Sequence, residues 1–331
     1  MGLVLIAIAA VCIGLFAGAA SISWPQILEV FQQHLSGQPG SSDALGYVIW
    51  ESRVPRVILA LLVGSALSLA GLVLQSAVRN PMADPYILGV TSGASAVNVL
   101  VIGFFPAALA AAVGPAAAFV GALLATSITL LLSKSKGKMV PLRLILAGVS
   151  VGYLGTAITS YVQYSASSDK LNTMIFWLLG SLAGARWDTL LLPALAIGLI
   201  FGWLLLRHRR MDLLLLSDES ASSLGLRVNA VRTEMLVIAS LLCGIVVALA
   251  GGVGFVGLMI PHLARLLVGP THRRLIPTTL LLGAGYLEIV DVLSRTIQRP
   301  QELPLGILTA ALGVPFLLWL LRRESQHQGG I

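Results

Sequence analysis

The chain carries two carboxylates, Glu288 and Asp291, inside an apolar stretch. Their spacing of three residues places both on one face of a helix. A carboxylate within a membrane would be costly enough to suggest a function, such as relaying protons or cations. A relay needs polar partners on other apolar stretches, and the stretch 143–164 offers none. We therefore favour a structural role, in which Asp291 pairs with Arg295 one turn later and Glu288 bonds to a neighbouring helix.

Histidine and cysteine, the common side-chain ligands of transition metals, show no clustered spacing in this sequence. His262 follows Pro261 within an apolar stretch and could ligate a haem iron, but a lone histidine there is more often a hydrogen-bonded structural residue. Cys12 and Cys243 stand alone in apolar stretches, where packing is their usual role. No metal site is predicted.

The sequence contains no motif for nucleotide binding or metal-assisted hydrolysis. A phosphate-binding loop needs GxxxxGK followed by Ser or Thr, and the segment SKSKGKM places Met139 after its Gly-Lys pair. The pattern HExxH is absent as well. The chain is therefore predicted not to be an enzyme and to have no cofactor of its own.

Composition decides the class of protein in which these residues are placed. Of the 331 residues, 57% are hydrophobic and 11% are charged, whereas about a quarter are charged in soluble domains. The length accommodates roughly ten helices of about 20 residues with short connections. The predicted fold class is an all-α polytopic membrane protein in which residues 1–331 form a single transmembrane domain.

Ten apolar stretches account for this architecture. The first is preferred as a span over a signal peptide because no basic residues precede it. The eighth packs four glycines into 251–257 ahead of Pro261, so we expect a short or broken helix entered through buried backbone. The predicted spans are 3–20, 57–78, 87–105, 113–132, 143–164, 189–206, 233–250, 255–268, 276–293 and 304–321.

The 21 lysines and arginines are distributed unevenly between the two sides that these spans define. With Met1 in the cytoplasm, fifteen of them fall on the cytoplasmic side and six on the outer side. Membrane proteins carry such an excess in their cytoplasmic loops. The sequence thus predicts that both termini are cytoplasmic, and the net charge of +7 reflects topology and not a nucleic-acid partner.

A polar insert at 207–228, RHRRMDLLLLSDESASSLGLRV, follows the sixth span and so faces the cytoplasm. Ser217 is a suitable helix N-cap, two acids follow it, and Gly225 is a suitable stop, so one or two short helices are predicted beneath the membrane. A linker lying on lipid headgroups is the alternative. The second half of the insert is small-sided with little apolar face, which fits a groove on a protein better.

Several stretches of the chain carry a family resemblance. They are SRVPRVILALLVGSALSLAGLVLQ, RNPMADPYILGVTSGAS, FWLLGSLAGARW, SDESASSLGL, GFVGLMIPHLARLLVGPTHRRLIP and QELPLGILTAALGVPFLLWLL. Over nearly its whole length the chain resembles the FecCD-type permeases of ABC importers for vitamin B12, haem and ferric siderophores. The resemblance implies a homodimer of ten-helix subunits in the lipid of the bacterial inner membrane. It further implies two cytoplasmic ATPase subunits, which hold ATP and Mg, and a periplasmic binding protein on the outer face.

The resemblance also assigns roles to individual residues. It implies that the insert forms a coupling helix that contacts the ATPase through Asp218, Glu219, Ala221, Ser222, Leu224 and Gly225. On the outer face it implies that three arginines pair with acidic residues of the binding protein, namely Arg53, Arg56 and Arg295. Anchoring of helix ends to lipid headgroups is the alternative for these arginines.

The stretch 143–164 carries a stripe of small and mildly polar residues at helical spacing: Gly148, Gly152, Thr156, Thr159 and Gln163. Such a stripe is typical of close helix packing. The resemblance implies instead that this helix lines the translocation path, where a wall without fixed charge would suit a bulky, partly apolar substrate. Both interpretations stay open at this point.

Two classes of transport function are consistent with the sequence. The first is the permease of an ATP-driven importer that passes an iron complex or a corrinoid inward along the dimer axis. The second is an ion-coupled secondary transporter working without an ATPase, supported only by the broken eighth span and the pair Glu288 and Asp291. Among substrates we prefer an iron complex, haem or a ferric siderophore, because that branch of the family is the broadest.

Overall fold

The computed structural model describes residues 2–18, 22–36, 44–135 and 138–328. Within these ranges the chain is helical apart from loops and one pair of two-residue strands, β1 (Lys134–Ser135) and β2 (Lys138–Met139). The strands are antiparallel, with Lys134 opposite Met139. The prediction of an all-α polytopic membrane protein is confirmed.

Ten apolar helices fall on the ten predicted spans in the part of the chain that the structure describes. Six of them are long and apolar enough to cross a bilayer: Ala44–Val78, α6 (Ala107–Leu132), α7 (Pro141–Ser165), α9 (Trp187–Leu214), α11 (Val228–Ala250) and α13 (His272–Thr296). Four apolar segments are shorter: Ala7–Phe16 in α1 (Gly2–Phe16), α5 (Val90–Phe104), α12 (Val256–Val268) and Leu305–Leu320 in α14 (Leu305–Gln328). The segment Ala44–Val78 comprises α3 (Ala44–Tyr47), the π-helical turn η1 (Val48–Arg53) and α4 (Val54–Val78).

The helix α4 forms the centre of the molecule. It is buried along almost its whole length and contacts α13, α11, α12 and α9. Two glycines permit this packing, because a Cβ atom at Gly64 would overlap the Gly283 carbonyl and one at Gly71 would overlap the Gly257 carbonyl. Without a hydrophobic drive between helices in lipid, close backbone approach of this kind is a main source of association.

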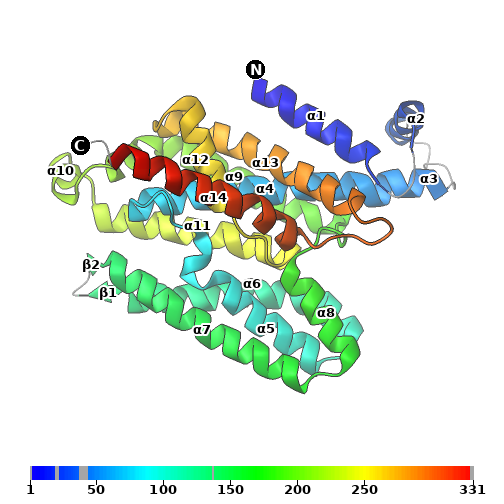
Figure 1. Cartoon of the computed structure of the whole chain (residues 1–331), viewed down its shortest axis with the longest axis horizontal. Coiled ribbons are helices and arrows are strands. Elements are labelled where there is room, and N and C mark those ends of the chain that lie inside the picture. Colours follow the sequence, from blue (N-terminus) through cyan, green and yellow to red (C-terminus); the bar gives the residue numbers. More distant parts are fainter. Residues whose placement is uncertain (1, 19–21, 37–43, 136–137, 329–331) are drawn as a thin grey trace.

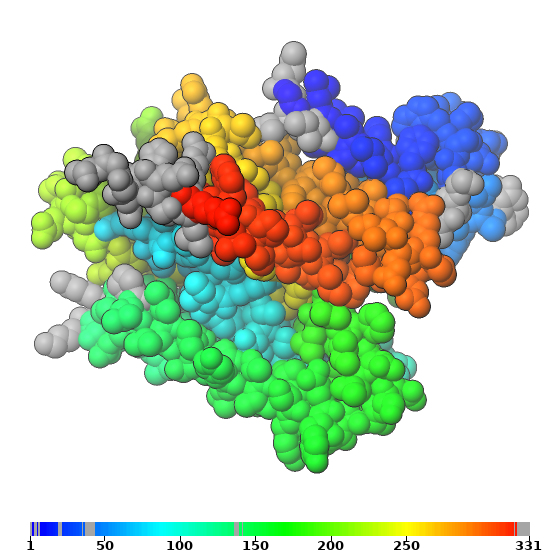
Figure 2. Space-filling view, viewed as in Figure 1, coloured from blue at the N-terminus to red at the C-terminus, as the bar shows by residue number. Residues whose placement is uncertain are grey.

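The helices α5, α6 and α7 pack on one another and form the lower lobe in Figure 1. The 3₁₀ turn η2 (Pro85–Leu88) leads into α5 and contacts both α7 and α11. In Figure 2 the green surface of α7 and α8 (Ser168–Leu179) forms the lower edge of the molecule. Side chains on the face of α7 turned away from α5 are exposed among the described residues, for example Tyr153 at 75% and Tyr161 at 71%.

The broken eighth span has the structure that the glycines predict. α11 ends at Ala250, residues 251–254 are not helical, and α12 starts at Val256. Polar groups of this segment are satisfied inside the protein: Tyr86 donates its hydroxyl to the Val253 carbonyl at 2.5 Å, and the Ser181 amide donates to the Ala250 carbonyl at 2.9 Å. Gly251 has φ +69°, a backbone conformation that residues with a side chain rarely adopt.

Two features differ from the sequence-based expectation. The sixth span does not end near 206, because α9 continues to Leu214 through residues that favour helix, so the polar insert contains a single separate helix, α10 (Asp218–Ser223). The helices α2 (Trp24–Leu35) and α8 were not predicted. Their sequences are too polar or too short for a span, and α2 places the side chain of Gln26 on the Ser23 amide at 2.8 Å, a cap for a short amphipathic helix.

The elements separate cleanly between the two ends of the bundle. Figure 1 shows α10, the β1–β2 pair and the carboxyl-terminal end of α14 at one end, and α2, α3 and α8 at the other. This arrangement agrees with a topology in which the insert, the 133–140 connection and the C-terminus share one side of the membrane.

Candidate functional site

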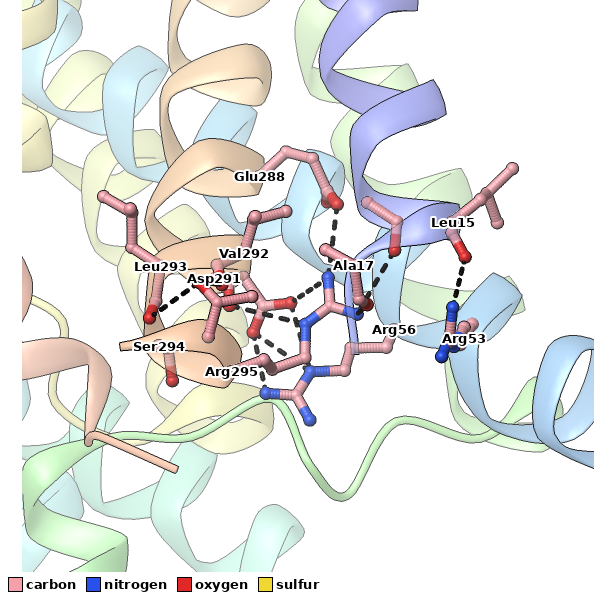
Figure 3. Close-up of polar contacts among 12 residues, drawn as sticks. Leu15, Ala17, Arg53, Arg56, Glu288, Asp291, Val292, Leu293, Ser294 and Arg295 are labelled. Atoms are coloured by element: carbon pink, nitrogen blue, oxygen red, sulfur yellow. Dashed lines mark hydrogen bonds and ion pairs between the residues drawn. The ribbon is translucent and has the colours of Figure 1, made fainter. Parts of the chain in front are cut away.

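Three buried charges and one exposed carboxylate form a cluster at the end of the bundle opposite α10. We call these residues the Asp291 cluster: Arg56, Asp291, Arg295 and Glu302. Arg56, in the first turn of α4, donates from Nε and Nη2 to Asp291 Oδ1 at 3.0 and 2.9 Å. Its Nη1 and Nη2 also donate to the two carboxylate oxygens of Glu302, both at 2.8 Å. The Arg56 guanidinium is thus held by two carboxylates at once, and Figure 3 shows its contact with Asp291.

Arg295 completes the cluster from α13. Its Nη2 lies 2.9 Å from Asp291 Oδ2, so the predicted pair of Asp291 with Arg295 is confirmed. Its Nη1 donates to the carbonyls of Ala17 at 2.8 Å and Gly14 at 3.2 Å. Arg53 donates in the same way to the carbonyls of Leu15 and Phe16, at 2.7 and 2.8 Å.

These contacts explain why arginines gather here. The last carbonyls of α1 have no intrahelical partner, and the guanidinium groups of Arg53 and Arg295 supply the missing donors. The three arginines expected on the binding-protein interface are accordingly almost fully buried, with exposed fractions of 4% for Arg53 and 7% each for Arg56 and Arg295. In this chain the three arginines connect α1, α4 and α13 through hydrogen bonds.

Glu288 lies one turn before Asp291 and is fully buried. The expectation that it bonds to a neighbouring helix is wrong, because neither carboxylate oxygen has a hydrogen-bond partner among the described residues. The helix facing it, α1, presents Gly14, whose Cβ would overlap Glu288 Oε1. The nearest counter-charge is Arg295 Nη2, 3.7 Å away (Figure 3).

At the other end of the bundle, α10 has the capping that the sequence predicts. The Ser220 amide donates to Ser217 Oγ at 3.1 Å, and Gly225 ends the segment with φ +83°. Of the residues expected to contact an ATPase, Glu219, Ser222, Leu224 and Gly225 are exposed, with Leu224 at 63%. Ala221 is fully buried and faces the chain itself.

Asp218, the remaining residue of that group, is engaged by two arginines. Its carboxylate accepts from Arg232 Nη2 at 3.0 Å and from Arg79 Nη2. These hydrogen bonds, with that of Arg232 the stronger influence, hold the pKa of Asp218 below its usual value. We call Asp218, Arg79 and Arg232 the Asp218 cluster. A surface cavity of about 480 Å³ adjoins it, lined by Met139, Ser222 and residues 226–230.

A second acid of the insert is also bound internally. Asp212 accepts hydrogen bonds from the backbone amide of His272 at 2.9 Å and from its ring Nδ1 at 2.7 Å, while the other ring nitrogen lies 2.8 Å from Ser76 Oγ. Five residues of these contacts were not predicted from the sequence: Asp212, His272, Arg79, Arg232 and Glu302. Their partners are far away in the chain, such as the 139 residues between Arg79 and Asp218, and no local spacing reports them.

The stripe on α7 divides between two faces of the helix. Gly148 and Thr159 are buried and Gly152 is half-buried on the side of α5, and a Cβ at Gly148 would overlap the Ile87 carbonyl. Thr156 is exposed and Gln163 is half-buried. The opposite face exposes larger groups, among them Tyr153 at 75% and Tyr161 at 71%. The small residues thus pack α7 against η2 and α5, while Thr156 and the two tyrosines are exposed.

His262 lies edge-on to Phe316, with ring centroids 5.9 Å apart. In the described ranges there is no group of three or more His, Cys, Asp or Glu side chains able to hold a metal ion. The chemistry available in these ranges is therefore that of ion pairs and helix packing.

Comparison with known proteins agrees with this architecture. The chain is 37% identical to the hemin transport system permease protein HmuU of Yersinia pestis, over 88% of this chain and 87% of that protein. It is also 37% identical to the vitamin B12 import system permease protein BtuC of Vibrio cholerae, over 84% and 83%. Among solved structures it is similar to an inward-facing putative metal-chelate type ABC transporter, with a TM-score of 0.85, 34% identity and coverage of 97% and 98%.

The sequence model of one family matches almost the whole chain, residues 5–323. That span includes both charged clusters, the broken eighth span and α10. The chain belongs to the FecCD transport family, whose members are the non-catalytic permease subunits of ABC transporters that use a separate ATPase.

Proposed function

We propose that this chain is the permease subunit of a bacterial inner-membrane importer that takes an iron complex, haem or a ferric siderophore, from a periplasmic binding protein. Two copies of the chain would form the translocation path, and two ATPase subunits would drive transport from the cytoplasm. The observation that carries this proposal is α10: a short, capped helix outside the bundle with an exposed tip, in a chain of the FecCD family.

The structure of α10 suits a contact that transmits movement. Its exposed residues are a carboxylate, a small hydroxyl and an apolar tip, namely Glu219, Ser222 and Leu224. Buried Ala221 and the Ser217 cap fix the helix to the chain from behind. An ATPase surface that closes on the tip of α10 would push a helix that is already ordered. Little of the movement would then be spent on ordering α10.

The outward face of α7 is proposed to line the path, with a second copy opposite. A helix facing only lipid gains nothing from Tyr153 and Thr156 near its midpoint, both of which are exposed here. Across a path these groups offer weak, uncharged contacts to a large substrate. In this arrangement Gly148, Gly152 and Thr159 support the wall by packing it on α5, and Gln163 lies toward the outer end.

For docking of the binding protein, the geometry favours Arg56 as the contact residue. One carboxylate on its guanidinium, Asp291, is fully buried, but the other, Glu302, has a side chain that is 41% exposed. A carboxylate of the binding protein can therefore take the position of Glu302 with the same two-pronged geometry. Arg53 and Arg295 would then hold the Arg56 site in place through α1.

The proposal is tested by isolating the chain with its ATPase and reconstituting the complex in liposomes with the binding protein. Uptake of haem, a ferric siderophore and cobalamin is compared with and without ATP. We expect ATP-dependent uptake of an iron complex and no response to an ion gradient alone. Uptake by the chain alone under an ion gradient, with no gain from ATP and the ATPase, would favour the secondary transporter.

A pair of matched variants tests the role of α10. Ser222→Trp places a bulky ring on the proposed ATPase contact, whereas Ser36→Trp makes the same change at an exposed helix end on the opposite side of the molecule. Ser222→Trp is expected to prevent co-purification of the ATPase, and Ser36→Trp to leave it unchanged. Equal behaviour of the two variants would remove α10 from the ATPase interface.

A further inference from the structure

We propose that Asp218 is a positioning residue that connects α10 to α4 and α11, and that it does not itself contact the ATPase. This inference rests on the proposed function, since it concerns how movement of α10 reaches the spanning helices. It replaces the role that the family resemblance implies for Asp218 with one based on its contacts.

The Asp218 cluster joins four helices through side-chain and backbone hydrogen bonds. Arg79, the residue after α4, binds the Asp218 carboxylate and donates from Nε to the Leu214 carbonyl at the end of α9, at 2.6 Å. Arg232, in the second turn of α11, binds the same carboxylate and donates from Nε to the Ala77 carbonyl near the end of α4, at 2.9 Å. The ends of α4, α9 and α11 thus meet at one carboxylate of α10.

The other side chains of α10 make few contacts with the rest of the described chain. The helix has six residues, and Ala221 is the one buried among them. Within the described residues, the neighbouring carboxylate of Glu219 makes no hydrogen bond or ion pair with the rest of the chain. Charge-assisted hydrogen bonds to planar guanidinium groups are directional and resist sliding better than contacts of a single alanine methyl group.

The two helices attached to Asp218 lead into the centre of the bundle. α4 is packed on α12 and α13 with backbone in contact at Gly71 and Gly64, so it cannot shift without them. α11 ends at the non-helical segment 251–254, where a change in backbone angles can be absorbed. A displacement of α10 can therefore reach α4 and α11 through the Asp218 carboxylate, beside the short connections that join α10 to α9 and α11.

The test uses the complex of the full chain with its ATPase, in a background of Cys12→Ser and Cys243→Ala with one reporter, Tyr153→Cys, on the exposed face of α7. The measured quantity is the rate at which a polar maleimide labels that cysteine, with and without ATP and vanadate. Nucleotide is expected to change this rate in the otherwise unaltered complex. No such change, or no bound ATPase, would contradict the proposed function itself.

In the same background, Asp218→Asn is expected to keep the ATPase bound and hydrolysing ATP while the nucleotide-dependent change in labelling falls roughly fivefold or more. Asp218→Glu retains the charge and is expected to recover most of the response. The matched control is Asp188→Asn, which removes an acid that is 62% exposed, like Asp218 at 56%, and paired with a single arginine at the outer end of α9. It is expected to respond as the parent does.

The inference is overturned if Asp218→Asn responds to nucleotide as strongly as the parent. It is also overturned if that variant loses the ATPase, since Asp218 would then be a contact residue. Should Asp218→Asn fail to fold, the two arginines are changed one at a time: Arg79→Gln removes the links of Arg79 to Asp218 and to the Leu214 carbonyl, and Arg232→Gln removes those of Arg232 to Asp218 and to the Ala77 carbonyl. An undiminished response in both variants would equally exclude the connection.

Discussion

At the scale of single residues, the molecule places its buried charges at the ends of helices, where they bind one another and the terminal carbonyls. Asp291 is fully buried between two arginines, and both arginines also bind other groups. A buried ion pair adds little net stability relative to apolar packing, but loss of one partner leaves an uncompensated charge. Removal of the Asp291 carboxylate is therefore expected to cost more stability than the modest net contribution of the ion pairs themselves.

Asp291→Asn is expected to lower the free energy of unfolding by about 3–5 kcal/mol, because Arg56 and Arg295 would stay buried without their shared carboxylate. Denaturation of the purified protein in detergent measures the change. Asp188→Asn, whose pair with Arg186 is solvent-exposed, is expected to cost at most about 1 kcal/mol. A comparable loss in both variants would show that burial does not govern the effect.

Protonation of Glu302 makes the stability of the Asp291 cluster depend on pH. Burial alone would raise the pKa of Glu302, but the hydrogen bonds and charge of Arg56 outweigh burial, so its pKa lies below the usual value. Because the folded-state pKa is depressed, the stabilisation is present above the unfolded pKa of about 4.3 and is lost as pH falls through the folded value.

The wild-type protein is accordingly expected to unfold at a higher temperature than Glu302→Gln above about pH 5, with the difference shrinking as pH falls below about 4.3 and vanishing below the folded-state pKa. Thermal unfolding of both proteins across that range measures it. A difference that persists unchanged at the acidic end would mean that the Glu302 carboxylate is not the group responsible.

At the scale of helices, glycine positions decide how closely α4 approaches its neighbours. A Cβ at Gly71 would meet backbone atoms of Gly257 on α12, which cannot rotate away. By contrast, nothing lies within 4 Å of a Cβ built at Gly202 on α9. The two glycines are equivalent in sequence terms, since both lie inside long apolar helices.

Gly71→Ala is expected to destabilise the protein by about 1–3 kcal/mol or more through overpacking against α12. Gly202→Ala is expected to be neutral or to stabilise the protein by up to about 1 kcal/mol, as the helix propensity of alanine predicts. Thermal unfolding in one detergent compares the pair. If the two variants lose stability equally, the close packing of α4 on α12 is not present in the membrane.

At the scale of the whole molecule, the orientation in the membrane determines which cluster meets which partner. α9 has 28 residues and is therefore about 42 Å long, enough to separate Asp188 at its start from α10 beyond its end by the thickness of a bilayer. The excess of lysine and arginine on the side of α10 predicts that this side is cytoplasmic.

A single cysteine at Ser222→Cys is expected to react with an impermeant maleimide only from the cytoplasmic side, and one at Asp188→Cys only from the outer side. Labelling of intact cells and of inverted membrane vesicles distinguishes the two, in the background without Cys12 and Cys243. Reaction of Ser222→Cys in intact cells would invert the topology and remove α10 from reach of an ATPase.

The sequence by itself determined the class of fold, the positions of the ten apolar helices, the interruption at 251–254, and the capped helix at 218–223. Each of these depends on local properties: apolar length, glycine density, and a serine followed by acids. The pair of Asp291 with Arg295 belongs to the same group, because residues four apart on a helix are neighbours whatever surrounds them.

Only the tertiary structure decided which charges meet across the chain. Arg56 and Asp291 are 235 residues apart, Arg79 and Asp218 are 139 apart, and Glu288 faces a glycine where a partner was expected. It also divided the stripe on α7 into a packed face and an exposed face. Contacts of this kind depend on how helices are stacked, and stacking is set by close backbone approach at a few glycines that look alike in the sequence.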